Sequence, residues 1–229
     1  MNYFYNFFKS FIYNLLHITF YLFKNKKVLF VCSYGGCASK YLVSELSDYF
    51  SFTYHIHDIN PSKKLKIPLR TKKKSEFSFS KFNCFFPKIY KVIFIVRKPS
   101  ESRISRGSVS HCINIGGDVK NYKENLYDYV KMNKDTMLYG KHLNNYLNKK
   151  PRNYDIIIIN FHKIFHSDFD FRKILEIKAP KKILLNFFKT DKYSKIDIET
   201  LNKLKELYRN LDEKVEKLPA YLKIKSSIT

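Results

Sequence analysis

The chain has few cysteine, glycine, proline and acidic residues, and no tryptophan at all. Its four cysteines, Cys32, Cys37, Cys84 and Cys112, do not have the spacing of a disulfide framework, which favours a reducing compartment. No combination of cysteines and histidines has the spacing of a four-ligand metal site, so we expect no metal. Internal repeats are also lacking, and 229 residues with 45% hydrophobic content suffice for one domain with a sizeable core.

Acidic residues are the most telling deficit. The chain has 20 Asp and Glu against 43 Lys and Arg, which gives a formal net charge of +23. A surface of this charge attracts nucleic acid, anionic membrane, acidic polysaccharide or a phosphate-rich cofactor. The same bias towards Lys, Asn, Ile, Phe and Tyr also follows from an AT-rich coding sequence, so charge alone selects no partner. Nucleic acid is disfavoured, because no known module with interleaved basic and aromatic residues is present.

A long apolar run that could cross a membrane is missing as well. Within residues 1–24, the stretch between Lys9 and Lys24 is shorter than the roughly 20 residues that span a bilayer, and polar residues interrupt it. These polar residues recur at helical spacing, so we expect an amphipathic N-terminal segment that lies on a membrane surface or packs on the domain. The basic cluster at 24–27 and the lack of a cleavage site predict a cytoplasmic chain, membrane-associated if the first alternative holds.

Residues 25–229 alternate between strand-like and helix-like patterns. Apolar runs predict strands, and periodic apolar positions predict helices. We expect strands at 28–33, 52–59, 91–97 and 154–161, and an irregular connection at 61–87. We expect helices at 39–50, from Pro99 onward, within 124–148, at 170–177 and at 198–218. This βα alternation predicts one three-layer α/β/α domain with a mostly parallel sheet.

The stretch SYGGCASK, residues 33–40, lies between the first predicted strand and helix. Small residues at such a junction leave backbone N–H groups free to bind an anion, and the helix N-terminus adds partial positive charge. It is not a nucleoside triphosphatase loop, because no Gly precedes Lys40, and Tyr41 replaces the hydroxyl residue that holds magnesium. The stretch therefore predicts an anion cradle of another kind.

Several stretches, in order, resemble the sulfotransferases that use 3′-phosphoadenosine 5′-phosphosulfate (PAPS). In that family a strand ends in a loop of the type T-Y-P-K-S-G-T-T-W-L, which SYGGCASKYL matches without a gap. A second strand ends in Arg with Ser eight residues later, as Arg97 and Ser105 do in VIFIVRKPSESRIS. The buried strand followed by FHKI, and the helix at 198–218, are similar too. The resemblance covers most of residues 26–218 and is weakest over 55–90.

The resemblance implies a P-loop-like sulfotransferase fold and transfer of a sulfuryl group from PAPS, without a metal, to a hydroxyl acceptor such as a carbohydrate or another small molecule. It implies that loop amides hold the 5′-phosphosulfate and that Arg97 and Ser105 bind the 3′-phosphate. The implied cofactor-binding residues are Ser33, Tyr34, Gly35, Gly36, Cys37, Ala38, Ser39, Lys40, Arg97 and Ser105.

One departure from the family pattern concerns catalysis. Gly36 stands where the family most often has a lysine near the sulfuryl group, and Cys37 and Ala38 replace its usual Ser and Gly. Lys40, one helical turn further, is our candidate for the missing charge; otherwise a residue outside the loop supplies it, or the protein binds the cofactor without turnover. Cys37 is either a buried small residue or a thiol nucleophile at a helix N-terminus.

A base for the acceptor hydroxyl is expected at the carboxyl edge of the sheet. Alternation along the second strand puts His55 and His57 on one side, with His57 nearer the end, so we choose His57 and keep His111 and His162 in reserve. Two other functions stay open. One is a degenerate P-loop kinase, and the other is a non-catalytic basic protein that binds polyanions.

Overall fold

The structure is a computed structural model, and its described residues are 5, 7–8, 11–12, 15, 28–50, 52–61, 90–148, 154–165, 169–178 and 193–226. Statements below concern these residues. Most of the predicted N-terminal segment and of the irregular connection at 61–87 lies outside them.

A five-stranded sheet forms the centre of the molecule, with the strand order β2-β1-β3-β4-β5. The first four strands are parallel, and β5 pairs with β4 in the antiparallel direction. The strands are β1 (Val28–Ser33), β2 (Phe52–Ile56), β3 (Tyr90–Val96), β4 (Ile156–Asn160) and β5 (Tyr221–Ile224). An order that runs outward in both directions from β1 and β3 is a doubly wound arrangement.

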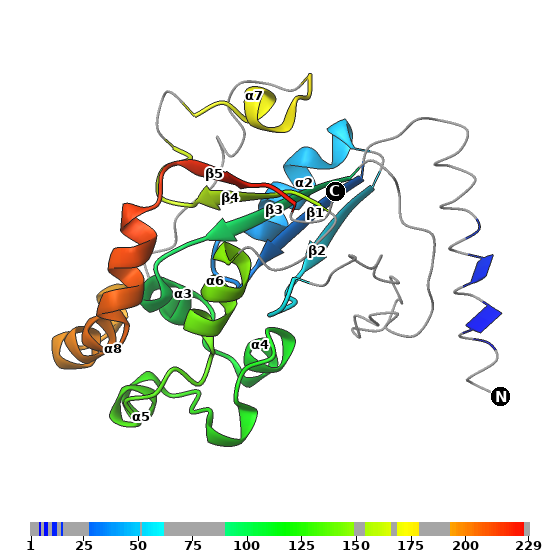
Figure 1. Cartoon of the computed structure of the whole chain (residues 1–229). Coiled ribbons are helices and arrows are strands. Elements are labelled where there is room, and N and C mark those ends of the chain that lie inside the picture. The colour runs from blue at the N-terminus through cyan, green and yellow to red at the C-terminus, as the bar shows by residue number, and fades with distance from the viewer. Residues whose placement is uncertain are drawn as a thin grey trace.

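Helices lie on both faces of this sheet, with α2 and α7 on one side and α3 and α6 on the other (Figure 1). The α-helices are α2 (Ser39–Leu46), α3 (Pro99–Ser105), α4 (Val109–Asn114), α5 (Leu126–Lys131), α6 (Tyr139–Leu147), α7 (Phe171–Leu175) and α8 (Ile198–Lys217). Short 3₁₀ turns occupy Ser47–Tyr49, Val119–Asn121 and Tyr193–Lys195. The prediction of an α/β chain with a mostly parallel sheet is confirmed.

The inner strands are apolar because helices cover both of their faces. Every residue of β1 and β4 is buried, and Phe30 and Phe94 are fully enclosed. The long helix α8 begins where Asp197 accepts a hydrogen bond from the Thr200 amide at 2.7 Å, and it buries an apolar stripe that includes Leu204.

Several boundaries differ from those predicted, and one strand was not predicted. The helix expected at 39–50 ends at Leu46, and the second strand ends at Ile56, so that His57 follows it. The tract 124–148 divides into α5 and α6, with left-handed residues Asn133 and Leu138 between them. Strand β5 was not predicted, since four residues after a helix carry too short a pattern.

Six residues of the N-terminal segment are described, and all are helical and exposed. They are Tyr5, Phe7, Phe8, Phe11, Ile12 and Leu15. Within the described part of the chain, no helix is both long and apolar enough to cross a bilayer. The choice between a membrane surface and the body of the domain stays a prediction.

Candidate functional site

The predicted site residues lie at the carboxyl edge of the sheet, where β1 has β2 on one side and β3 on the other. The loop from Tyr34 to Ala38 follows β1, His57 follows β2, and Arg97 follows β3. In open α/β sheets, the crevice between strands whose connections run to opposite faces is the usual place for a ligand. The topology therefore brings together residues that are 63 positions apart in the sequence, such as Tyr34 and Arg97.

Two glycines let the surrounding helices approach the loop closely. Gly35 has φ +90°, and a Cβ there would lie 2.1 Å from Cε1 of His111. Gly36 has φ +70°, and a Cβ there would lie 3.0 Å from the Ser102 Cα and 3.2 Å from the Ser105 Cβ. A lysine at position 36 would therefore collide with the last turn of α3. The departure from the family pattern at this position matches the packing of this chain.

The N-terminus of α2 is suited to an anion. Ala38 precedes the helix in the left-handed conformation, with φ 54° and ψ 21°, and no side chain caps the helix. Together with the positive φ of Gly35 and Gly36, this turn presents successive backbone N–H groups beside the positive end of the helix dipole. Lys40 is exposed in the first turn of α2. Partial charges from the backbone and a nearby lysine are the features that a bound phosphate or sulfuryl group needs.

A chain of hydrogen bonds holds the loop in this shape. The Gly35 amide donates to Ser33 Oγ at 3.2 Å, and Ser33 Oγ donates to Ser39 Oγ at 2.9 Å. The Ser39 hydroxyl is then left to donate to His55 Nε2, 2.8 Å away. This direction makes His55 the acceptor, so its neutral ring carries the proton on Nδ1.

Three histidine rings line the β2 side of the loop. His57 Nδ1 lies 2.6 Å from the Ser33 carbonyl oxygen, to which it donates, so the neutral ring keeps its lone pair on Nε2. Its ring centroid is 4.2 Å from that of His55 and 5.7 Å from that of His111. His111 Nε2 donates to the Tyr34 carbonyl at 3.1 Å. The predicted base His57 and the reserve candidate His111 thus both lie against the loop.

The charged groups on the β2 side of the loop are cations. Burial, together with the charges of His57, Lys40 and Arg106, lowers the pKa of His55 to about 3. Burial also lowers the pKa of His111 to about 4, with His57 and Arg106 adding to the effect. Both rings are therefore neutral at pH 7. The positive charges of Lys40 and Arg106 disfavour protonation of the nearby histidines, and the same charges would favour an anionic ligand.

On the β3 side of the loop, the buried Arg97 makes several interactions. Its Nη1 donates to the Gly36 carbonyl at 2.8 Å, and its Nε lies 2.7 Å from Oε2 of Glu101. The guanidinium carbon is 4.9 Å from the centroid of the Phe161 ring. The Tyr34 hydroxyl bonds to the backbone of Arg97, whose amide donates to it at 3.0 Å. Arg97 and Tyr34 thus fasten the end of β3 to the loop.

The structure adds two residues, Glu101 and Arg106, that were not predicted from the sequence. Glu101 stands four residues after Arg97, and that helical spacing was a signal for an ion pair. The reserve candidate His162 also lies on this side, with Nε2 3.3 Å from Glu101 Oε2. The second is Arg106, which follows Ser105 directly, but its sequence position does not reveal that its charge helps to lower the pKa of His55 and His111. In this structure, the predicted phosphate ligand Arg97 therefore faces a carboxylate.

Cys37 is a buried small residue. Its thiol donates to the Gly35 carbonyl at 3.0 Å, and burial raises its pKa to about 12. A thiol that stays protonated at neutral pH is a poor nucleophile. The alternative role of Cys37 as a nucleophile is therefore disfavoured.

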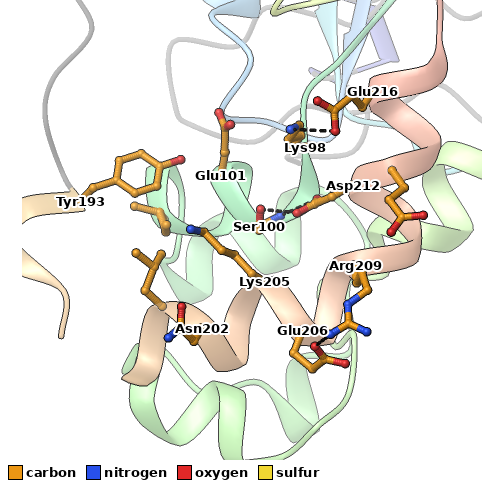
Figure 2. Close-up of a pocket in the computed structure, with 13 residues that line it drawn as sticks. Lys98, Ser100, Glu101, Tyr193, Asn202, Lys205, Glu206, Arg209, Asp212 and Glu216 are labelled. Carbon is orange, nitrogen blue, oxygen red and sulfur yellow. Dashed lines mark hydrogen bonds and ion pairs between the residues drawn. The ribbon is translucent and has the colours of Figure 1, made fainter. Parts of the chain in front are cut away.

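A hollow of about 650 Å³ opens beyond Glu101, between α3 and α8 (Figure 2). Dashed lines in Figure 2 mark the interactions of Lys98 with Glu216 and of Ser100 with Asp212, and Arg209 forms an ion pair with Glu206. Its carboxylates are Glu101, Glu206, Asp212, Glu213 and Glu216, and its cations are Lys98, Lys205 and Arg209. This excess of carboxylates disfavours an anionic ligand, which is better served by the basic side of the loop.

Comparison with known proteins identifies no relative of this chain. No protein-family model matches the chain, and no curated protein or solved structure is significantly similar to it.

Proposed function

We propose that this protein is a sulfotransferase that moves a sulfuryl group from PAPS to a hydroxyl acceptor, such as a carbohydrate or another small molecule. The observation that carries the proposal is the contact of Arg97 and Ser105 with the loop at Gly36. The two stretches whose patterns resemble the cofactor-binding segments of sulfotransferases thus meet at one corner of the sheet.

The loop residues fit the anionic end of such a cofactor. Backbone amides of residues 36–39 and the uncapped start of α2 would hold the 5′-phosphosulfate, with Lys40 adding a charge from the first turn. Arg97 and Ser105 would bind the 3′-phosphate. Because Glu101 is the competing anion at Arg97, binding requires the guanidinium to exchange that carboxylate for the phosphate.

His57 would remove the proton from the acceptor hydroxyl. Sulfuryl transfer needs an acceptor that loses its proton, and the lone pair on Nε2 of the neutral ring can accept one. The bound cofactor would supply the sulfuryl group and a phosphate leaving group, whose developing charge aimed donors stabilise. His57 is the base, and Lys40 is the cation of the first turn.

A thermal-shift comparison of adenosine 3′,5′-bisphosphate with ATP and magnesium tests the proposal. A ligand that binds only the folded state raises the apparent melting temperature by mass action. We expect the bisphosphate to give the larger shift. A larger shift with ATP would favour the degenerate kinase. Equal shifts with heparin and both nucleotides, lost at high salt, would favour a non-catalytic polyanion-binding protein.

Two variants sharpen this test on the intact chain. Ser105→Ala should weaken bisphosphate binding, whereas Ser44→Ala, which removes an exposed hydroxyl from α2, should leave it unchanged. Glu101→Gln should strengthen binding by about 3- to 10-fold, because it removes the anion that competes for Arg97. Weaker binding by Glu101→Gln, in a variant that melts like the parent, would contradict the role of Arg97. Transfer of radiolabelled sulfate to a panel of hydroxyl acceptors then tests turnover.

A further inference from the structure

We propose that Arg106 supplies the main positive charge, with Lys40 as a weaker and more screened contributor, for the anionic group that the loop between Gly35 and Ser39 holds. This inference rests on the proposed function, because it assigns a residue to the same nucleotide. None of residues 33–39 is charged, so the loop itself offers only backbone dipoles. A buried or half-buried anion needs a cation as well, and that cation must come from a neighbouring element.

The packing of α3 fixes Arg106 at the rim of the loop. The last turn of α3 lies against Gly36, with the Ser102 Cα 3.0 Å and the Ser105 Cβ 3.2 Å from the place where a Cβ would be. Arg106 is the next residue, and its amide donates to the Ser102 carbonyl at 2.9 Å. Its side chain is exposed. The start of the side chain is therefore held by the helix that touches the loop, while its end is open to a ligand.

The three arginines near α3 differ in what they bind. Arg97 is committed to Glu101 and the Gly36 carbonyl. Arg103 is buried, and its Nη2 donates to the carbonyls of Lys123 and Glu124 at 2.9 and 2.8 Å. Arg106 forms no ion pair or side-chain hydrogen bond with any other residue that the structure describes. Its guanidinium is the one of these three that a ligand meets without displacing a protein partner.

The charge of Arg106 reaches both ends of the loop. His55 bonds to Ser39 at one end, and His111 lies over Gly35 at the other. Burial is the main cause of the lowered pKa of both rings, and the positive charge of Arg106 contributes to the lowering in each. A planar guanidinium in that position suits the paired oxygens of a phosphate or sulfuryl group, which it can bind with two parallel hydrogen bonds.

Isothermal titration of the full chain with three probes tests this assignment. The probes are adenosine 3′,5′-bisphosphate, adenosine 3′-monophosphate, which lacks the 5′ group, and inorganic pyrophosphate. Arg106→Gln should weaken the bisphosphate and pyrophosphate by about 10- to 100-fold, the value of a charge-assisted hydrogen bond, and change the monophosphate less than threefold. Arg106→Lys should recover part of the loss. Arg209→Gln is the matched control, because it removes an exposed arginine of α8 that pairs with Glu206.

The outcomes separate this inference from the proposed function. If the parent binds pyrophosphate but neither nucleotide, the proposed function fails, and a loss of pyrophosphate binding in Arg106→Gln still supports the role of Arg106. Unchanged affinity of Arg106→Gln for the bisphosphate and pyrophosphate would overturn the inference. Equal losses for the bisphosphate and the 3′-monophosphate would also overturn it, because Arg106 would then not act on the 5′ group. Binding of none of the probes by the parent would overturn both proposals.

Discussion

The two sides of the Gly35–Ser39 loop differ in charge and in what their charged groups do. On the β2 side, neutral histidines lie beside Lys40 and Arg106, and neither cation is paired with a carboxylate in the described part of the chain. On the β3 side, Arg97 is buried and paired with Glu101, and the hollow beyond is rich in carboxylates. The comparison teaches that the cations of the β2 side are directly open to a ligand, whereas the buried Arg97 holds the loop in place and meets a ligand only after it releases Glu101.

Gly36 joins the two sides. Its carbonyl accepts a hydrogen bond from Arg97, and its missing side chain lets α3 approach with Arg106 at its end. Removing the interactions of the β3 side should therefore lower the free energy of unfolding, in addition to its effect on 3′-phosphate binding, whereas removing the cations of the β2 side should weaken binding alone. The predictions below test this division.

Replacing Arg97 should have the largest effect. Arg97→Met leaves the Glu101 carboxylate and the Gly36 carbonyl without their partner, and breaking a buried pair from one side costs about 3–5 kcal/mol. Urea unfolding of the variant measures this loss. The double variant Arg97→Met, Glu101→Gln should recover part of it, because the unpaired charge is gone. A loss below about 1 kcal/mol in the single variant would show that Arg97 does not fasten the loop.

Filling the space at Gly36 should have the next largest effect. Gly36→Ala combines a left-handed conformation with a Cβ 3.0 Å from the backbone of α3, and we expect a loss of about 2–4 kcal/mol. Gly116→Ala is the matched control, since φ is +71° there but the nearest atom would be 3.6 Å away, so only the cost of about 1 kcal/mol for φ remains. If denaturant unfolding gave equal losses of unfolding free energy for the two variants, the close approach of α3 to Gly36 would not contribute to stability.

Acid should destabilise the protein through its buried neutral histidines. His142 stacks on Phe94 in the core, and burial lowers its pKa to about 3 from an ordinary value of 6.5. The unfolded chain therefore takes up a proton below pH 6.5 that the folded state refuses until about pH 3, so stability falls as the pH is lowered through this window. The free energy of unfolding should fall less between pH 6 and pH 4 in His142→Phe than in the parent. The two slopes should differ by up to about 1.4 kcal/mol per pH unit. An unchanged slope would mean that His142 is protonated in the folded state.

Removing Lys40 should have the smallest effect on binding. The side chain is exposed in the first turn of α2, so its interaction with an anion on the loop is screened by solvent and salt. Lys40→Gln should weaken adenosine 3′,5′-bisphosphate by about 2- to 5-fold at low salt, and less at high salt. Lys141→Gln, on the exposed surface of α6, is the control. A salt-independent loss above 10-fold would place Lys40, rather than Arg106, as the main cation of the loop.

Much of the fold could be predicted from local patterns. The apolar runs at β1, β3 and β4 gave those strands within a few residues, because a strand covered on both faces needs such a run whatever its neighbours are. The junction of β1 and α2 was likewise readable from its small residues. The edge strand β5 was missed, because an exposed four-residue strand is stabilised by its pairing with β4 rather than by its own sequence.

The candidate site divides in the same way. By itself, the sequence determined the glycine turn before α2, the polar residues that end the strands, and the surplus of basic residues, because each depends on neighbours within a few positions. Only the tertiary structure decided that α3 lies on Gly36, that Arg97 faces Glu101 while bonding to the loop, and that His55 accepts from Ser39. It also decided that the charge of Arg106 helps to lower the pKa of the histidines. Most of these contacts join elements that are far apart in the chain, and the order of the strands brings them together.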